Sequence, residues 1–293
     1  MELHLIRHGP KNKNPAAHGT GVEALLDPER AVDIIGYGYK FLNSTFLVGR
    51  NTLYVESTPV PRAVATANIV QKVFTLDPRF QVPEPSINNL IGSYICNPTG
   101  TEIINLSPMA MSDVWAKAKK EAAKEGRLDE DLSLYEWCKE GFDNPKASIS
   151  RDPGISLREI ACRIGAYVHS TLTKDNSLSA DCYFAIGHSG DIEPFLYLTL
   201  EMLQKRDGSD YNTLLKYFPI TRALTPLTGL SFYTMNNGRA RVDIHRCYSS
   251  LDEGLKGQLE EGIPLNIFEQ QANWLRDFGK SKLVLEQKIA AGK

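Results

Sequence analysis

The sequence lacks the cysteine spacings of a zinc site or a disulfide framework. Its five cysteines are odd in number and scattered, with no Cys-x-x-Cys pair: they are Cys96, Cys138, Cys162, Cys182 and Cys247. Both kinds of site need cysteines grouped at short, regular spacings. We therefore expect reduced thiols that pack as small hydrophobic side chains, and no metal ion.

The chain also lacks a hydrophobic run long enough to span a bilayer, and its first residues lack the charged and apolar regions of a secretory signal. Its formal net charge is −2. No excess of positive charge is therefore present for nucleic acid or an anionic membrane, and any basic site must be local. These absences favour a cytoplasmic protein without such partners. They leave the oligomeric state open, with a homodimer as one option.

What the sequence does contain is typical of a large globular domain. Of its 293 residues, 42% are hydrophobic and 23% are charged, enough to bury a sizeable core. A charged block with helical patterns, 99–152, predicts a cap inserted over a site, and the polar stretch 249–293 predicts a helical C-terminal extension. We expect one domain over 1–293 that carries both additions.

Hydrophobic patterns predict the elements of this domain. Short apolar runs at 3–6, 53–55 and 182–186 predict buried strands, and the last is continuous, as in a sheet covered on both faces. A helix is expected over 27–42. Another should begin near Pro61, because Ala63, Ala67, Val70 and Phe74 recur on one helical face. Asn-Asn-Gly at 236–238 predicts a β-hairpin.

Residues suited to phosphate chemistry stand where these strands end. Arg7, His8 and Gly9 follow the first strand, and His188 follows the late apolar strand. Arg62 opens the helix after Pro61, at the positive end of the helix dipole, where a cation is unfavourable unless an anion binds. A guanidinium offers a fork of donors to an oxyanion, and a neutral imidazole can act as a nucleophile. Together they predict a phosphate site.

Arg7-His8-Gly9 after the first strand, Arg62 opening a helix, and Gly187-His188 after a late strand resemble the histidine phosphatase superfamily, which is phosphoglycerate mutase-like. The resemblance covers roughly 1–75 and 155–245. It implies a three-layer α/β/α fold, with helices on both faces of the sheet and an inserted helical cap. It also implies that His8 takes the phosphoryl group while Arg7, Arg62 and His188 bind its oxygens, so that no metal or cofactor is needed.

Two backbone contributions accompany this site. Gly9 lets a bound group approach the main chain, and N–H groups at the helix start near Ser189 could donate to a small phosphorylated substrate. We therefore count Gly9 and Ser189 with Arg7 and Arg62 as substrate-binding candidates.

The sequence departs from the family at the general acid. Members usually carry a Glu in the loop after the third strand, and Asn89 stands there in this chain. Asp191, Glu84 and Glu102 are the candidates to replace it. Asp191 is three residues past His188, but it also suits the N-cap of a helix beginning at 192, and the cap role is favoured. Without an acid, aryl phosphates should be better substrates than sugar phosphates.

Three functions remain open at this stage. The favoured one is a metal-independent phosphatase that hydrolyses a phosphate monoester through a phosphohistidine at His8. The others are a phosphoglycerate-type mutase and a non-catalytic protein that binds phosphorylated ligands. The physiological substrate cannot be deduced from the sequence.

Overall fold

A mixed seven-stranded sheet forms the centre of the computed structural model, which describes residues 1–11, 25–44, 47, 49–96, 99, 103–105, 157–174, 181–207, 226–245, 257 and 259–290. The strand order is β3-β2-β6-β1-β7-β8-β9, and a separate two-stranded sheet pairs β4 with β5. The strands are β1 (Glu2–Arg7), β2 (Thr52–Ser57), β3 (Ser86–Ile87), β4 (Tyr94–Cys96), β5 (Ile103–Asn105), β6 (Asp181–Gly187), β7 (Gly229–Thr234), β8 (Arg239–His245) and β9 (Ile263–Pro264).

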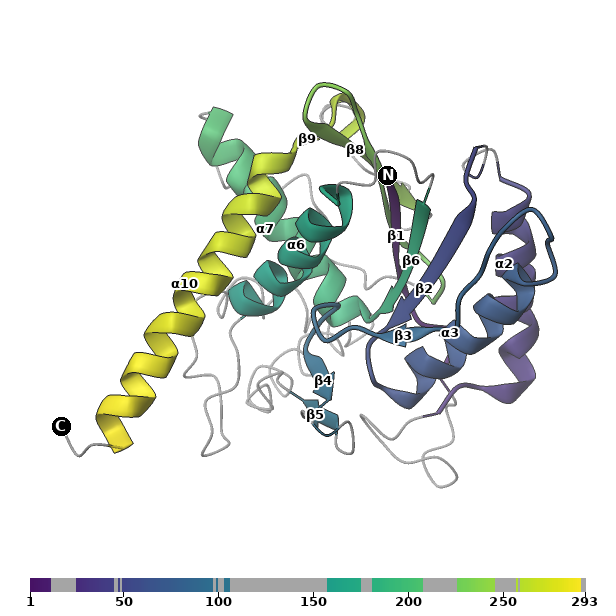
Figure 1. The fold of residues 1–293 in the computed structure, drawn as a ribbon, viewed down its shortest axis with the longest axis horizontal. Coiled ribbons are helices and arrows are strands. Elements are labelled where there is room, and N and C mark those ends of the chain that lie inside the picture. The colour runs from purple at the N-terminus through teal and green to yellow at the C-terminus, as the bar shows by residue number, and fades with distance from the viewer. Residues whose placement is uncertain are drawn as a thin grey trace, which may run out of the picture.

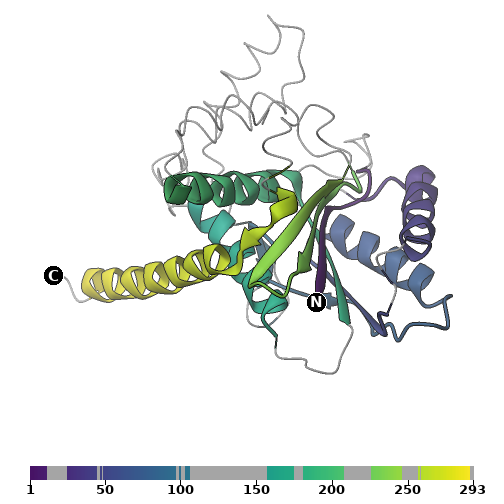
Figure 2. The same cartoon turned by 90° about the horizontal axis from the view of Figure 1, so that it is seen from above.

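Helices cover both faces of the large sheet (Figure 1, Figure 2). On one face lie α2 (Ala31–Leu42), preceded by the short 3-10 helix η2 (Pro28–Arg30), and α3 (Pro61–Phe74). On the other lie α6 (Leu157–Leu172), α7 (Ser189–Asp207) and α10 (Leu265–Ala290). The expected three-layer α/β/α architecture is confirmed. Among the described residues, no helix is both long and apolar enough to cross a membrane.

The two faces of the sheet explain the sequence patterns. Alternate residues of a strand point to opposite faces, so Leu3 and Leu5 pack against α6 and α7, whereas Ile6 packs beneath α2 and α3. Every residue of β6 is buried, as its continuous apolar run predicted. The face expected for α3 is also correct, because Ala63, Ala67, Val70 and Phe74 are all fully buried.

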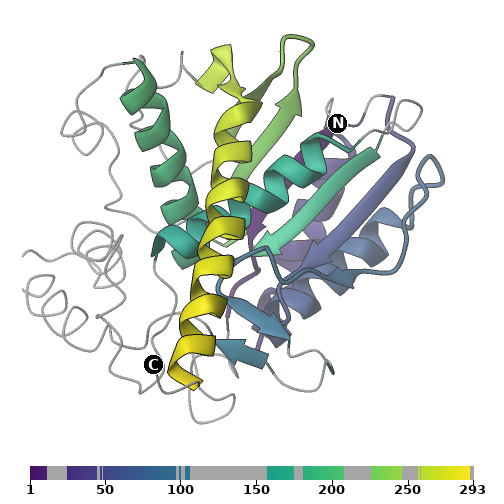
Figure 3. The ribbon, with the colours of Figure 1, turned by 60° about the vertical axis from the view of Figure 1, so that its left-hand side comes forward.

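Strand register places the predicted functional positions at one edge of the sheet. β1, β6 and β2 run parallel, with Arg7 opposite Gly187 and Ser57 opposite Ile186. The segments that follow these three strands therefore emerge side by side. The β4-β5 pair lies beyond this same end of the sheet (Figure 1, Figure 3).

The first described elements of the C-terminal region, β9 and the start of α10, belong to the core. β9 pairs with β8, and the first turns of α10 bury Ile267, Phe268 and Gln271 against the layer of α6 and α7. Gly165 in α6 allows this close approach, because a Cβ there would lie 1.9 Å from the Gln271 Oε1 atom. The extension predicted at 249–293 thus supplies an edge strand and a packed helix to the domain.

Most of the cap predicted at 99–152 lies outside the described residues, which there include Thr99 and β5. The helical patterns of this block also lie outside them. The cap and the division of the chain into one domain with two additions stay predictions.

Candidate active site

His8 lies at the end of β1 as a buried, oriented imidazole. Its Nδ1 atom is 2.6 Å from the Gly9 carbonyl oxygen, and the Arg62 Nε atom is 3.0 Å from its Nε2 atom. The carbonyl can only accept and the guanidinium can only donate, so the proton sits on Nδ1 and Nε2 keeps its lone pair. Burial, followed by the charge of Arg62, lowers the pKa of His8 to about 3. The ring is therefore neutral at neutral pH, with its nucleophilic nitrogen facing a cation.

Arg62 is the buried cation of this site. Pro61 begins α3, so Arg62 occupies the first turn, and its side chain turns inward to leave the residue only 7% exposed. Its Nη2 atom is 3.4 Å from His188 Nδ1, in addition to the bond to His8. The charge of Arg7 also lowers the pKa of both histidines, so a second guanidinium is close enough to act on them. Two cations and two imidazoles thus surround one small volume.

His188 connects β6 to α7 and faces His8. The two ring centroids are 5.0 Å apart. His188 Nε2 is 2.9 Å from the Thr58 hydroxyl, and since Arg62 donates toward Nδ1, the ring proton lies on Nε2 and points to Thr58. Burial and the neighbouring His8 and Arg62 lower the pKa of His188 well below its ordinary value. A bound dianion would favour the protonated ring, because an opposite charge raises a histidine pKa.

Asp191 lies in the first turn of α7 and does not cap a helix that begins at 192. The helix begins at Ser189, and the carbonyl of His188 accepts its first backbone hydrogen bonds, so the predicted N-cap role was wrong. The Asp191 carboxylate is instead 2% exposed and accepts hydrogen bonds from the backbone and side chain of Ser93. Its Oδ2 atom has no hydrogen-bond partner among the described residues.

Burial gives this carboxyl group an unusual proton affinity. It raises the pKa of Asp191 to about 6, although the hydrogen bonds from Ser93 and the charges of Arg163 and Arg62 act in the opposite direction. Near pH 6, a carboxyl group of this kind can both give and take a proton. Among the three candidate acids, Asp191 is the one that the described structure buries beside Arg62.

The other candidates have different surroundings. Glu84 is exposed on the segment before β3, and Glu102 lies outside the described residues. Gly9 donates its N–H to the Thr66 hydroxyl at 3.0 Å and accepts from His8, so both its backbone groups contact protein. Ser189 begins α7, which aims backbone N–H groups toward the strand ends, but its side chain lies outside the description.

Sequence reasoning missed four polar residues of this site. Thr58 orients His188, and Thr66 orients Gly9. Ser93 contacts Asp191, and Tyr94 contacts the ring of His188. Thr58 directly follows β2, so the strand-end rule that located His8 could have found it. Ser93 ends an irregular loop and Tyr94 begins the three-residue strand β4, and hydrophobic periodicity gives no signal in segments this short.

Asn89, which stands where the family resemblance places a Glu, closes that loop. Its Oδ1 atom accepts the N–H of Cys96 at 2.9 Å, and its Nδ2 atom donates to the Cys96 carbonyl at 3.4 Å. From α6, Arg163 donates to the carbonyls of Asn89 at 2.5 Å and Gly92 at 3.2 Å. The loop 89–96 is thus fixed at both ends and in its middle.

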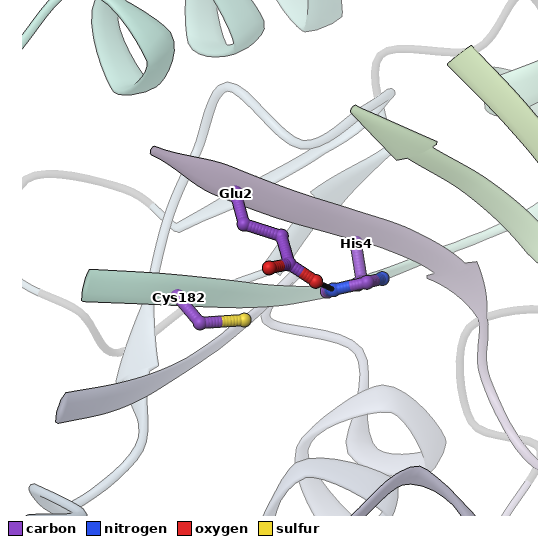
Figure 4. Close-up of side chains that lie close together, drawn as sticks. All are labelled: Glu2, His4 and Cys182. Carbon is purple, nitrogen blue, oxygen red and sulfur yellow. Dashed lines mark hydrogen bonds and ion pairs between the residues drawn. The ribbon is translucent and has the colours of Figure 1, made fainter. Parts of the chain in front are cut away.

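One group of metal-ligand side chains occurs among the described residues, at the opposite end of β1 (Figure 4). Glu2, His4 and Cys182 are buried, with ligand atoms within 4.8 Å of one another. Glu2 already bonds to His4 at 2.5 Å and to the Arg50 guanidinium at 3.2 Å. Burial raises the pKa of the Cys182 thiol well above its ordinary value. Because the ring of His4 and the guanidinium of Arg50 already occupy the two carboxylate oxygens of Glu2, we assign this group to the stability of the sheet.

The fold brings the candidate functional residues together at one edge of the sheet. Arg7, His8, Arg62 and His188 meet at the carboxyl ends of β1, β2 and β6, between helical layers, as the sequence resemblance implied. The fold is therefore a three-layer α/β/α domain with the candidate site at the carboxyl ends of its parallel strands, as the sequence resemblance implied.

Solved structures similar to this chain include a mycobacterial glucosyl-3-phosphoglycerate phosphatase (14% identity, TM-score 0.48, covering 83% of this chain and 97% of the other). They also include a Hafnia alvei phytase (14%, 0.40, covering 93% and 95%) and a Plasmodium falciparum phosphoglycerate mutase (15%, 0.35, covering 85% and 94%). No family model and no curated protein matches the sequence. Because these TM-scores lie below 0.5, we draw no conclusion about this chain from the three likenesses.

Proposed function

We propose that this protein is a metal-independent phosphatase of the histidine phosphatase type, which hydrolyses a small phosphate monoester through a phosphohistidine at His8. The observation that carries the proposal is the orientation of His8. Its Nδ1 proton is held by the Gly9 carbonyl, while its Nε2 lone pair faces the guanidinium of Arg62. An oxyanion bound to Arg62 would lie beside a neutral nucleophile. A cytoplasmic location goes with this proposal as a prediction.

In the first step, Nε2 of His8 attacks the phosphorus atom as the bond from phosphorus to the ester oxygen breaks. Arg7 and Arg62 bind the equatorial oxygens and stabilise their charge, which is the main requirement of phosphoryl transfer. The leaving alkoxide takes the proton of Asp191, whose pKa of about 6 leaves it substantially protonated in weakly acidic solution. The products of this step are an alcohol, the phosphohistidine and the Asp191 carboxylate.

In the second step, water hydrolyses the phosphohistidine. The Asp191 carboxylate removes a proton from the attacking water, the bond between phosphorus and Nε2 breaks, and inorganic phosphate leaves. His8 returns to its neutral form and Asp191 to its acid form. The same carboxyl group thus serves as acid and then as base, a role that a pKa near the working pH favours.

The buried, partly unpaired carboxyl group favours a phosphatase over a non-catalytic binding protein. Burying an ionisable group with an unpaired oxygen destabilises the fold, and such groups occur preferentially at functional sites. A mutase remains the second alternative, because it would use the same first step and return the phosphoryl group to its substrate.

Trapping the covalent intermediate tests the proposal. The protein is mixed with a ³²P-labelled phosphate monoester, quenched in alkali, in which phosphohistidine is stable, and digested for peptide mapping. We expect label on the peptide that contains His8 and none in the His8→Ala variant. The His4→Ala variant is the control for loss of a buried histidine on the same strand. Release of phosphate by the wild type without label on the His8 peptide would refute catalysis through His8, and transfer of label to a phosphoglycerate instead of water would identify a mutase.

A further inference from the structure

Tyr94 lies inside the candidate site although no pattern in the sequence singles it out. It begins β4, and its ring centroid is 4.8 Å from that of His188, with the rings tilted by 55°. Its hydroxyl is hydrogen-bonded to the side chain of Arg62. One side chain thus contacts both the buried cation and the second imidazole of the site.

The hydrogen bond to Arg62 determines what the hydroxyl group can still do. A guanidinium has donors and no acceptor, so the phenol oxygen must accept this bond. The proton of the Tyr94 hydroxyl is then left for a different acceptor. Burial and the nearby Asp191 carboxylate raise the pKa of Tyr94, so it keeps that proton at neutral pH. The acceptor most suited to a position beside Arg62 is an anionic oxygen bound to the same guanidinium.

We propose that the Tyr94 hydroxyl donates a hydrogen bond to a non-bridging oxygen of the phosphoryl group held by Arg62. This assignment rests on the proposed function, because it concerns the same bound phosphoryl group. It adds a neutral donor to the two cationic ones of Arg7 and Arg62. A neutral donor strengthens binding of the oxyanion without increasing the repulsion between the two guanidiniums.

The fixed loop explains how a residue of the small sheet reaches this position. Asn89 closes the loop 89–96 through the backbone of Cys96, and Arg163 holds the carbonyls of Asn89 and Gly92. The adjacent Ser93 bonds to Asp191. The segment therefore places Ser93 against Asp191, the candidate acid, and Tyr94 against Arg62. Asn89 holds the segment in this shape and does not supply an acid.

Direct titration of inorganic phosphate tests this assignment independently of turnover. In calorimetry, we expect the Tyr94→Phe variant to bind phosphate about 10- to 100-fold more weakly than the wild type, because it loses one hydrogen bond to a charged group. Tyr54→Phe is the matched control: the ring centroid of Tyr54 is likewise 4.8 Å from that of another ring, Tyr183, but Tyr54 lies within β2. Circular dichroism checks that each variant is folded. Equal phosphate affinity in the wild type and Tyr94→Phe would overturn the proposal.

A double-mutant cycle separates direct donation from an effect that acts through Arg62. If Tyr94 donates to the ligand, Tyr94→Phe also weakens phosphate binding severalfold in the Arg62→Ala background. If Tyr94 only holds Arg62 in place, the double variant binds phosphate as well as Arg62→Ala does, and direct donation is refuted. A wild type that binds phosphate but forms no phosphohistidine would refute the proposed reaction and leave the assignment of Tyr94 intact.

Discussion

Replacing Asp191 by Asn should remove proton donation while preserving the shape of the site. The amide oxygen of Asn can still accept the hydrogen bonds of Ser93, but the amide group cannot protonate a leaving oxygen at catalytic pH. Loss of a general acid typically lowers a rate by about 10²- to 10⁴-fold. We expect a loss of this size in kcat/KM for an alkyl ester such as glycerol 3-phosphate, whose alkoxide is a very poor leaving group.

An aryl ester should be much less affected. A phenol has a pKa of about 10, far below that of an alcohol, so phenolate leaves with little help from an acid. For phenyl phosphate, we expect the loss in Asp191→Asn to be ~10-fold or less. The variant would then prefer aryl over sugar phosphates, the behaviour that the sequence alone predicted for a site without an acid.

The pH dependence of the reaction provides a second measure of the same group. Because the first step needs protonated Asp191 and neutral His8, kcat/KM for the alkyl ester should be highest between their pKa values, about 3 and about 6. Above pH 6, it should fall about tenfold per pH unit. The substrate also ionises near pH 6, but its contribution cancels when the wild type and Asp191→Asn are compared on one ester.

The assay measures steady-state release of inorganic phosphate from both esters between pH 4 and pH 8. Asp33→Asn is the control, because Asp33 is an exposed acid on α2, paired with Arg30, and its loss should change neither substrate preference nor pH profile. Equal losses on the alkyl and aryl esters, or an unchanged pH profile in Asp191→Asn, would show that Asp191 is not the acid.

Three further outcomes follow from the structure. Asp191 should contribute a fall of about 3 kcal/mol in the free energy of unfolding as pH rises from about 4 to above 6, because its folded-state pKa of about 6 exceeds its ordinary value of 3.8 and the unfolded chain loses the proton first. The lowered pKa values of His8 and His188 act in the opposite direction over this range, so the contribution of Asp191 is measured as the difference between urea titrations of the wild type and of Asp191→Asn. Arg62→Ala should lower kcat/KM by about 10²- to 10³-fold, the typical cost of a lost oxyanion donor. Unchanged kinetics would show that Arg62 does not bind the phosphoryl oxygens. Gly229→Ala should destabilise the fold by about 3 kcal/mol or more in thermal unfolding, because the added Cβ would lie 1.9 Å from the Leu5 backbone oxygen. The control Gly36→Ala should stabilise the fold by about 0.5–1 kcal/mol, because Gly36 lies in a helix and its added Cβ would meet nothing within 4 Å.

The elements whose residues repeat locally could be predicted from the sequence. The apolar runs of β1 and β6 and the apolar face of α3 follow periods fixed by backbone geometry, so their positions were correct. The meeting of His8, Arg62 and His188 was also predictable, because parallel strands end at one edge of a sheet. The positions of these chemical groups thus follow from local pattern and one topological rule.

Tertiary structure decided which carboxyl group can serve as the acid and which side chains surround Arg62. In the sequence, Asp191, Glu84 and Glu102 are equivalent candidates. Burial in the folded chain distinguishes Asp191, because it raises the pKa of this carboxyl group even though the hydrogen bonds from Ser93 lower it. The approach of Tyr94 to Arg62 likewise depends on a loop held by Arg163 from a distant helix. A sequence pattern records the spacing of residues along the chain, whereas proton affinity and hydrogen bonding depend on which groups lie nearby once the chain has folded.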